Sequence, residues 1–418
     1  MDIKDYMQRL LKDARDSSRN MALAGTLLKN RALEKMADGL ESANAVIVSE
    51  NEKDTSTAKE AGLSSAVIDR LTLTESRIKD MADGVREIIG LKDPVGEVLE
   101  GHVRPNGLRI EKVRVPLGVV GIIYESRPNV TADAASLCLK TGNSVILRGG
   151  KESINSNIAI YKVISSAVEA AGLDKRCVQV VETTDRFAVE LLLKADEYVD
   201  VIIPRGGEDL IRRVADESRI PVIKHYKGVC HTFVDEFADF NMAREICINA
   251  KVQRPATCNA METMLVHNKI AEKFLPEIIK SMQEAGVEIR GCEKTCNIIK
   301  NIKAATEDDW SEEYLDLVLS VKVVSSLEEA MDHICRYGSA HSDAIVTESY
   351  TNAAKFTNEV DSAATYVNAS TRFTDGREFG MGAEIGISTD KLHARGPMGL
   401  PELTSYKYIV RGSGQIRK

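Results

Sequence analysis

The spacing of apolar residues divides the chain into a helical first part and a longer part in which strands and helices alternate. Within residues 1–90 apolar side chains recur at steps of three and four, as at Ile78, Met81, Ala82 and Val85. This spacing is typical of helices that bury one face. Asp93-Pro94 then ends the pattern, because a residue that precedes proline disfavours helical geometry.

Residues 98–115 predict a β-hairpin. Apolar and polar positions partly alternate there, β-branched residues are frequent, and Asn106-Gly107 stands in the middle. Asn-Gly is typical of two-residue hairpin turns, in which both turn positions have positive φ. Because an isolated ribbon is marginal in water, we expect it to pack on something, such as another subunit. Residues 405–410 alternate in the same way and predict one more strand.

From residue 117 onward, short unbroken apolar runs alternate with helical segments. Such runs are typical of parallel strands that are buried on both faces. The predicted strands are 119–124, 144–147, 178–181, 199–203 and 221–223, then, beyond a domain boundary near residue 229, 232–234, 263–266, 317–324 and 364–368. The clearest predicted helices are 153–171, closed by Gly172, then 241–252, 271–285 and 327–337. The fold class is therefore α/β, with two doubly wound parallel-sheet domains.

Composition narrows the class of protein only a little. The chain has 418 residues, of which 43% are hydrophobic and 28% charged, as in ordinary globular proteins, and it is too long for one core. A net charge of −8 does not favour nucleic acid as a partner. The sequence has neither an apolar run of membrane-spanning length nor the features of a signal peptide, so we expect a cytoplasmic protein.

Eight cysteines are present, and none forms a C-x-x-C pair. A cytosolic chain of this size keeps its thiols reduced. Cys292 and Cys296 are close together, but no histidine stands near them at zinc-finger spacing, so we expect no metal site.

Cys258 is the cysteine with the most suggestive surroundings. The stretch 252–262 reads Val-Gln-Arg-Pro-Ala-Thr-Cys-Asn-Ala-Met-Glu and joins a predicted helix to a predicted strand. Pro255 ends the helix and Asn259 tolerates turn geometry, so Cys258 stands in a tight turn. Arg254 nearby favours a thiolate, which is the nucleophilic form of cysteine. On spacing alone, a buried structural cysteine remains the alternative.

Several blocks, taken together, resemble the γ-glutamyl phosphate reductases, a branch of the aldehyde dehydrogenase superfamily. They occur in order between residues 115 and 405. The blocks are Val-Val-Gly-Ile-Ile-Tyr-Glu-Ser-Arg-Pro-Asn-Val-Thr at 119–131, Lys-Thr-Gly-Asn at 140–143, Ile-Pro-Arg-Gly-Gly at 203–207, Gln-Arg-Pro-Ala-Thr-Cys-Asn-Ala at 253–260, Tyr-Val-Asn-Ala-Ser-Thr-Arg-Phe at 366–373, Phe-Gly-Met-Gly-Ala-Glu-Ile-Gly at 379–386 and His-Ala-Arg-Gly-Pro-Met-Gly-Leu at 393–400.

The resemblance implies that Cys258 is a nucleophile. The implied reaction is the NADPH-dependent reduction of L-glutamate 5-phosphate to L-glutamate 5-semialdehyde and phosphate through a cysteine thioester, the second step of proline biosynthesis from glutamate. The alternative is another aldehyde dehydrogenase or acyl-phosphate reductase with a related substrate. A catalytically idle scaffold on the same fold is a third possibility, and the Cys258 turn and the glycine blocks argue against it.

One departure from the superfamily favours acyl phosphate reduction. Hydrolytic aldehyde dehydrogenases carry a glutamate, which activates water against the thioester, in the segment that leaves the cofactor domain. The matching stretch, His225-Tyr226-Lys227-Gly228, has no carboxylate. A thioester destined for hydride must not be hydrolysed. A base supplied from elsewhere in the chain remains the alternative.

The resemblance also suggests which residues contact the substrate. Asn129 is the candidate side-chain amide for the oxyanion hole, with the backbone N–H of Cys258, although it equally fits a helix N-cap. Arg127 and Arg254 are candidates for binding phosphate and carboxylate, with exposed surface arginines as the alternative. Four residues after the last strand are candidates for the amino-acid end of the substrate, or else form an ordinary polar turn: Asn368, Ser370, Thr371 and Arg372.

The cofactor candidates lie after two strands of the first series. Arg148 and Lys151 follow the strand 144–147, and two cations there suit the extra phosphate of NADPH. Arg205, Gly206 and Gly207 link a strand to a helix, where glycines let backbone N–H groups approach phosphate. Glu313 resembles the glutamate that holds the nicotinamide ribose, with Glu312 as an adjacent competitor and a solvated charge as the alternative for both.

The expected domains follow from the same comparison. Residues 1–96 and 117–229 form an NADP-binding domain, with 386–400 as a candidate return to it, and residues 230–385 form the catalytic domain. Residues 97–116 and 404–412 form an oligomerisation element, so we expect a homo-oligomer, dimer or tetramer. Contact with a glutamate 5-kinase is a further expectation, because the acyl phosphate is labile.

Overall fold

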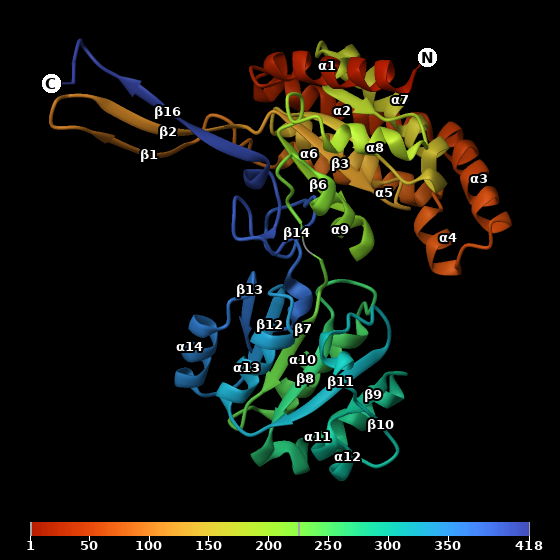
Figure 1. The fold of residues 1–418 in the computed structure, drawn as a ribbon, viewed down its shortest axis with the longest axis vertical. Helices are drawn as coiled ribbons and strands as arrows, with labels where there is room; N and C mark the ends of the chain where they lie inside the picture. The colour runs from red at the N-terminus through yellow and green to blue at the C-terminus, as the bar shows by residue number, and fades with distance from the viewer. Residues whose placement is uncertain (1, 225, 418) are drawn as a thin grey trace. The chain divides into compact units, whose positions relative to one another are not determined.

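The computed structural model describes residues 2–224 and 226–417, and the chain divides into two compact units (Figure 1). Unit 1 comprises Met1–Lys224, Gly380–Gly386 and Met398–Lys418, and unit 2 comprises His225–Phe379 and Ile387–Pro397. The break after residue 224 lies a few residues before the boundary expected near 229. None of the described helices is long and apolar enough to span a membrane.

Five helices open unit 1. Three of them begin at a side chain that accepts a hydrogen bond from the first helical turn, namely Asp2, Ser64 and Thr74, which satisfies N–H groups that have no partner within the helix. The helices are α1 (Ile3–Met21), α2 (Thr26–Ser42), α3 (Asn44–Glu60), α4 (Ser65–Leu71) and α5 (Glu75–Gly90).

A four-stranded parallel sheet forms the centre of unit 1, with strand order β5-β4-β3-β6. Its strands are β3 (Val119–Tyr124), β4 (Ser144–Arg148), β5 (Val178–Val180) and β6 (Val201–Arg205). Its helices are α6 (Val130–Lys140), α7 (Ile154–Ala171), α8 (Arg186–Leu193) and α9 (Glu208–Glu217). Ile123 packs in a core with α1 and α8, while the next residue, Tyr124, hydrogen-bonds Thr131 of α6. Because neighbouring strand residues point to opposite faces, helices cover both faces of the sheet.

The predicted hairpin is present, as β1 (Val98–Val103) and β2 (Arg109–Pro116), and β16 (Thr404–Arg411) pairs antiparallel with β2. The predicted turn type was wrong. Gly107 has a φ of +89°, whereas Asn106 is not among the residues with positive φ. Gly107 donates to Arg104 and Arg104 donates to Leu108, which is a three-residue loop closed by a glycine bulge. Pro105 explains the difference, because its ring fixes the φ that begins a type I turn.

Unit 2 is built on a seven-stranded sheet in which every described pairing is parallel, with strand order β10-β9-β11-β8-β7-β12-β13. The strands are β7 (Cys230–Val234), β8 (Met261–His267), β9 (Glu288–Gly291), β10 (Lys303–Ala304), β11 (Val318–Val324), β12 (Ser342–Val346) and β13 (Ala364–Val367). The helices are α10 (Phe240–Val252), α11 (Asn268–Glu284), α12 (Glu293–Ile298), α13 (Leu327–Tyr337) and α14 (Tyr350–Glu359).

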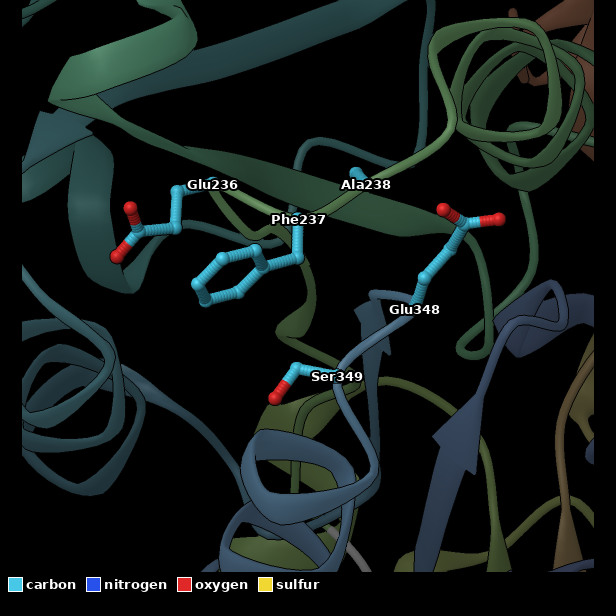
Figure 2. A pocket seen from close by; sticks show the side chains of 5 residues that line it. All are labelled: Glu236, Phe237, Ala238, Glu348 and Ser349. Carbon is cyan, nitrogen blue, oxygen red and sulfur yellow. The ribbon is translucent and has the colours of Figure 1, made fainter.

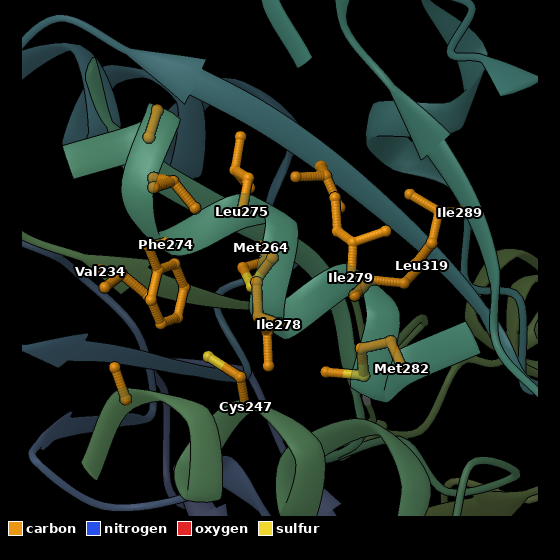
Figure 3. Close-up of a cluster of buried hydrophobic side chains, with 14 of the residues drawn as sticks. Val234, Cys247, Met264, Phe274, Leu275, Ile278, Ile279, Met282, Ile289 and Leu319 are labelled. Atoms are coloured by element: carbon orange, nitrogen blue, oxygen red, sulfur yellow. The ribbon is translucent and has the colours of Figure 1, made fainter. Parts of the chain in front are cut away.

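Two apolar clusters cover the two faces of this sheet. Met264 and Val266 of β8 pack with Phe274 and Ile278 of α11 and with neighbours on α10 (Figure 3). Leu265, which lies between them in sequence, packs instead with α13 and α14. The continuous apolar runs of the sequence therefore correspond to strands that are buried on both sides.

Two further expectations need correction. The predicted strand 221–223 is reduced to one isolated bridge from Val222 to Ile202, and Pro221 has no N–H to extend it. The predicted return 386–400 is split, because residues 387–397 belong to unit 2. Asp361 of unit 2 holds them through ion pairs with Lys391 and Arg395, and β14 (Ile387–Ser388) and β15 (Gly396–Pro397) pair with each other.

Candidate active site

Cys258 lies in the turn between α10 and β8, as predicted. Val252 ends the helix, the Thr257 hydroxyl donates to the Arg254 carbonyl at 2.8 Å, and the Ala260 N–H donates to the Thr257 carbonyl at 3.0 Å. The thiol of Cys258 is free and half-buried, unlike the buried thiols of Cys138 and Cys230. The turn therefore presents this thiol just before the amino end of β8.

Gly228 packs directly against the backbone of Cys258. A Cβ atom at position 228 would lie 2.0 Å from the Cys258 carbonyl oxygen and 2.6 Å from its Cα, so only glycine fits. The same carbonyl accepts a hydrogen bond from the Cys230 thiol at 3.2 Å. Sequence reasoning noticed residue 228 only for its lack of a carboxylate. His225, the first residue of that stretch, lies outside the described residues.

A carboxylate from elsewhere does reach this stretch. The N–H of Gly228 donates to Glu313 Oε1 at 2.9 Å, and Lys227 Nζ lies 3.8 Å from Glu312. The structure thus brings Glu313, one of the predicted cofactor residues, to the segment that packs on Cys258. Which of the two glutamates contacts a cofactor remains a prediction.

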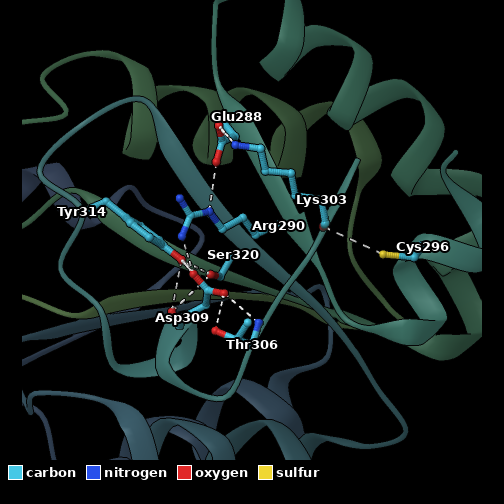
Figure 4. Close-up of polar contacts among 8 residues, drawn as sticks. All are labelled: Glu288, Arg290, Cys296, Lys303, Thr306, Asp309, Tyr314 and Ser320. Atoms are coloured by element: carbon cyan, nitrogen blue, oxygen red, sulfur yellow. Dashed lines mark hydrogen bonds and ion pairs between the residues drawn. The ribbon is translucent and has the colours of Figure 1, made fainter. Parts of the chain in front are cut away.

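The segment that carries Glu313 is held by a polar network (Figure 4). The hydroxyl of Tyr314 donates to Asp309 Oδ1 at 2.7 Å and lies 2.8 Å from the Ser320 hydroxyl, and Arg290 binds Asp309 at 2.6 Å. Burial opposes ionisation of Asp309, but hydrogen bonds from Thr306, Arg290 and Tyr314 outweigh it and lower the pKa of this carboxyl. Asp309 is therefore a charged anchor for the residues before β11.

Asn259 joins the Cys258 turn to the predicted substrate segment 370–372. Its backbone carbonyl accepts from the Thr371 hydroxyl at 2.7 Å, and its amide donates to the Thr374 carbonyl at 2.9 Å. The guanidinium of Arg372 donates to the side-chain oxygen of Asn259 and to Gln253 at 2.9 Å. Sequence reasoning assigned Asn259 a role in the turn alone, and no local signal revealed these contacts.

Two cations lie in the neighbourhood of Cys258. Arg254 is exposed, and Arg372 is half-buried. The pKa of Arg372 is lowered, first by burial and then by the charge of Arg254, while Cys258 opposes the shift. Two guanidinium groups near one another favour the binding of an anionic group in this neighbourhood.

The other two substrate candidates, Asn368 and Ser370, are engaged within the protein. The Asn368 side chain accepts from the Thr347 N–H and donates to the Thr347 carbonyl, both at 2.9 Å, and Asn368 has a φ of +55°. Ser370 is buried, and its hydroxyl accepts from the Arg372 N–H at 3.3 Å. Contact of either residue with a substrate remains a prediction.

The oxyanion candidate Asn129 is exposed in unit 1. It stands at the N-cap position of α6, as the alternative expected, but its backbone is helical and its side chain makes no capping hydrogen bond. The amide instead donates to Asp133 at 2.9 Å, one turn further along α6. Arg127 is also exposed, two residues earlier in the same loop.

The cofactor candidates of unit 1 gather at the carboxyl edge of its sheet. Arg148 ends β4 and Arg205 ends β6, the two strands that flank β3, while Lys151 is exposed after β4. The Nε of Arg148 is buried and, among the described residues, has no hydrogen-bond partner. Burial lowers the pKa of Arg148.

Gly206 and Gly207 lie before α9 and already bind an anionic group. The N–H of Gly207 donates to the carboxylate of Glu125 at 2.8 Å. A Cβ atom at Gly206 would lie 2.5 Å from the same carboxylate. The glycines therefore allow the Glu125 carboxylate to approach the start of this helix, and the binding of a phosphate there remains a prediction.

An open surface depression of about 330 Å³ lies elsewhere in unit 2 (Figure 2). It is lined by Glu236, Phe237, Ala238, Glu348 and Ser349. These residues follow the carboxyl ends of β7 and β12, whereas Cys258 precedes the amino end of β8. In a parallel sheet these are opposite edges, so the depression is not part of the Cys258 site.

Comparison with known proteins supplies the family. Residues 4–298 match the aldehyde dehydrogenase family. A γ-glutamyl phosphate reductase from Thermodesulfovibrio yellowstonii is 56% identical over all 418 residues, covering 100% of both chains, and one from Moorella thermoacetica is 59% identical over 97% of each.

The chain belongs to the γ-glutamyl phosphate reductases of the aldehyde dehydrogenase family.

The crystal structure of the γ-glutamyl phosphate reductase from Thermotoga maritima agrees with this assignment. It is 49% identical, covers 99% of this chain and 100% of its own, and superposes with a TM-score of 0.97. The predicted α/β fold of the aldehyde dehydrogenase type is thereby confirmed. The reductase family also implies a nicotinamide cofactor, while the individual site residues remain predictions.

Proposed function

We propose that this reductase converts L-glutamate 5-phosphate to L-glutamate 5-semialdehyde and phosphate, with NADPH as reductant and Cys258 as nucleophile. The full-length identity of 56% to a γ-glutamyl phosphate reductase carries the proposal. The free, half-buried thiol of Cys258 in a tight turn supports the assigned nucleophile.

The residues of the chain divide the reaction into two steps. The Cys258 thiolate attacks the acyl carbon, and the carbon–oxygen bond to phosphate breaks, which leaves a thioester and free phosphate. The backbone N–H of Cys258 and the amide of Asn129 are assigned to the oxyanion. The sulfur–carbon bond of the reduced thiohemiacetal then breaks, which releases the aldehyde and restores the thiolate. Arg127, Arg254 and Arg372 supply positive charge for the phosphate and the carboxylate of the substrate.

The nicotinamide cofactor supplies the hydride when it is bound. The residues of unit 1 fit such a group, because Arg148 has a buried Nε without a partner among the described residues. We assign Arg148 and Lys151 to the adenosine end, and Arg205, Gly206 and Gly207 to a phosphate. In unit 2 we assign Glu313 to the nicotinamide ribose. Preference for NADPH over NADH is part of this proposal.

Replacement of the nucleophile tests the proposal. We expect Cys258→Ala to lower NADPH- and phosphate-dependent turnover by roughly 10⁴-fold or more, because the thioester no longer forms. Binding of NADPH, measured by fluorescence titration, is expected to persist. Cys335→Ala is the matched control, since that thiol is exposed on α13, and it should keep wild-type turnover. Turnover by Cys258→Ala at the wild-type rate would contradict the proposed mechanism.

Oxidation of an aldehyde to an acid is the second candidate function. The carboxylate of Glu313 favours it, because this group is bound to the stretch that packs on Cys258. Because that carboxylate already accepts the hydrogen bond from Gly228, we assign it an anchoring role and not that of a base, which favours the reductase reaction. The reverse reaction separates the two candidates: oxidation of the semialdehyde must require phosphate in a reductase and proceeds without it in a hydrolytic enzyme.

Three expectations about the cellular setting belong to the same proposal. We propose a cytoplasmic homo-oligomer, either dimer or tetramer, whose contacts involve the sheet β1-β2-β16. We also propose that a glutamate 5-kinase delivers the labile acyl phosphate by direct contact. The exposed apolar residues of that sheet support the homo-oligomer, and the lability of the substrate motivates the contact with the kinase.

A further inference from the structure

A buried ion pair closes the base of the Cys258 loop. Lys251 lies in the last turn of α10 and Glu262 is the second residue of β8, so the ten residues between them carry Cys258. The Lys251 ammonium lies 2.5 Å from Glu262 Oε2, and both side chains are fully buried. The ion pair therefore links α10 to β8, the two elements that the Cys258 turn connects.

Stability alone is a poor reason for such a pair. Burial lowers the pKa of Lys251 and raises that of Glu262 to about 7, which reflects the cost of placing both charges away from water. Apolar residues of similar volume usually stabilise an interior at least as well as a buried ion pair. The other contacts of Lys251 and Glu262 therefore indicate what the pair does.

Glu262 has a second contact, on the segment that carries Glu313. Its Oε1 accepts from the N–H of Leu315 at 3.3 Å, and the Lys251 ammonium lies 5.9 Å from the centre of the Tyr314 ring. Leu315 has a φ of +52°, a left-handed conformation that is uncommon for residues other than glycine. The Glu262 carboxylate thus accepts from a backbone that needs support to hold this conformation.

Glu313 connects this segment to the Cys258 turn. Two residues before Leu315, the Glu313 carboxylate accepts from Gly228, which packs on the Cys258 backbone. Tyr314 holds the other side of this short segment through Asp309 and Ser320. Glu262 is therefore linked to the site in two ways. It follows the nucleophile by four residues in sequence, and it accepts a hydrogen bond from the segment that carries Glu313.

We propose that Glu262, paired with Lys251, is a positioning residue that fixes the Glu313 segment against the Cys258 turn. This inference rests on the proposed function, because it takes Cys258 as the nucleophile and Glu313 as a cofactor ligand. Glu262 itself touches neither reactant in the proposal. It acts through Leu315, by keeping the Glu313 carboxylate on Gly228.

Two double variants separate the hydrogen bond to Leu315 from the charges. K251M/E262Q removes both charges but keeps a side-chain oxygen for the Leu315 N–H. K251M/E262L removes both charges and the acceptor. Neither leaves a buried charge without its partner, so we expect both proteins to fold with similar thermal unfolding midpoints. K251M/E262M is a second apolar pair for the case that leucine does not pack, because methionine adapts to irregular space.

We expect K251M/E262Q to keep turnover within about threefold of wild type and K251M/E262L to lose about 10- to 100-fold, since small displacements of reacting groups are costly. NADPH affinity should fall in the second variant alone. Adding L315G to K251M/E262L should recover part of the turnover, because glycine holds positive φ without support. Equal kinetics in the glutamine and leucine variants would overturn the inference.

The matched control replaces another buried ion pair. Lys29 and Asp93 of unit 1 lie 2.5 Å apart and are almost fully buried, and K29M/D93N should keep wild-type turnover. A loss there equal to that of K251M/E262L would overturn the inference, because any buried pair would then suffice. Cys258→Ala distinguishes the two levels: if it is inactive while K251M/E262L has wild-type kinetics, the proposed function stands and only the role of Glu262 fails.

Discussion

Gly228 shows how one residue without a side chain constrains a site. Its Cα faces the backbone of Cys258, so a methyl group there meets main-chain atoms that have no rotamer with which to move aside. The same residue donates its N–H to Glu313. A displacement of Gly228 therefore disturbs the nucleophile and a proposed cofactor ligand together.

We accordingly expect Gly228→Ala to lower turnover by about 100-fold, as displacements near 1 Å do in active sites. Gly84→Ala is the control, because a Cβ in the middle of α5 meets nothing within 4 Å and should stabilise the helix by about 1 kcal/mol. Steady-state kinetics and thermal unfolding of the two variants measure both effects. Wild-type turnover by Gly228→Ala would show that the Cys258 backbone tolerates the shift.

The buried ring of His333 leads to a prediction about how the stability of the protein depends on pH. The ring is 3% exposed, its Nδ1 lies 3.1 Å from the Lys322 ammonium, and its Nε2 is buried without a partner among the described residues. Burial, followed by the charges of His231, Lys322 and Arg336, lowers the pKa of His333 to about 2. The folded protein therefore holds this ring neutral.

The sign of the effect follows from proton uptake. Between about pH 2 and pH 6.5 the unfolded chain binds a proton at His333 that the folded protein does not, so stability falls as pH falls, by up to about 1.4 kcal/mol per pH unit. His333→Asn keeps an oxygen for Lys322 but does not titrate. Urea unfolding from about pH 7 to pH 5 should show a shallower loss in this variant. Equal slopes in the two proteins would contradict the prediction.

At the scale of elements, the sequence was most informative where a segment is regular and buried. The helix 327–337 was predicted with the residues that α13 has, and the strand 119–124 with those of β3. Both have a strong periodic or continuous apolar pattern, which follows from the faces they bury. Gly172, predicted to close a helix, has a φ of +94° directly after α7.

Elements that depend on distant partners were missed. The strand β12, Ser342–Val346, was not predicted, although it lies between β7 and β13 in the sheet. Its buried residues include Ser342, whose hydroxyl lies 2.6 Å from the Thr374 hydroxyl, and Asp343, which accepts from the His231 N–H and the Ser362 hydroxyl. Buried polar residues of this kind interrupt the apolar pattern that predicts a strand. Their hydrogen-bond partners are not adjacent in sequence, so no local pattern reveals them.

The site shows the same division. Family blocks and turn chemistry pointed to Cys258 and to segment 370–372, and the structure brings these two together through Asn259. The contact joins residues 113 positions apart, which no local pattern encodes. The roles of Gly228, Lys251 and Glu262 depend on packing and hydrogen bonds of the same long-range kind, so they appear only in three dimensions.

At the scale of the whole molecule, the sheet β1-β2-β16 stands out because much of its surface is exposed within a single chain. Every residue of β1 is exposed, so the strand buries neither face within its own chain. Tyr406, Tyr408 and Val410 alternate along the edge strand β16 and are each at least half exposed. Exposed edges with apolar side chains favour association with another chain.

We therefore expect the purified protein to be a dimer or tetramer at assay concentrations, as measured by light scattering. Y408K/V410K should shift the mass toward the monomer, because charged side chains along an edge strand oppose pairing with a second chain. Leu23→Lys is the control, since Leu23 is 85% exposed between α1 and α2, outside the strands of that sheet, and should leave the mass unchanged. A wild-type protein that is monomeric at assay concentrations would remove this sheet from consideration as an assembly element. An unchanged oligomer in Y408K/V410K would place the contact on another surface.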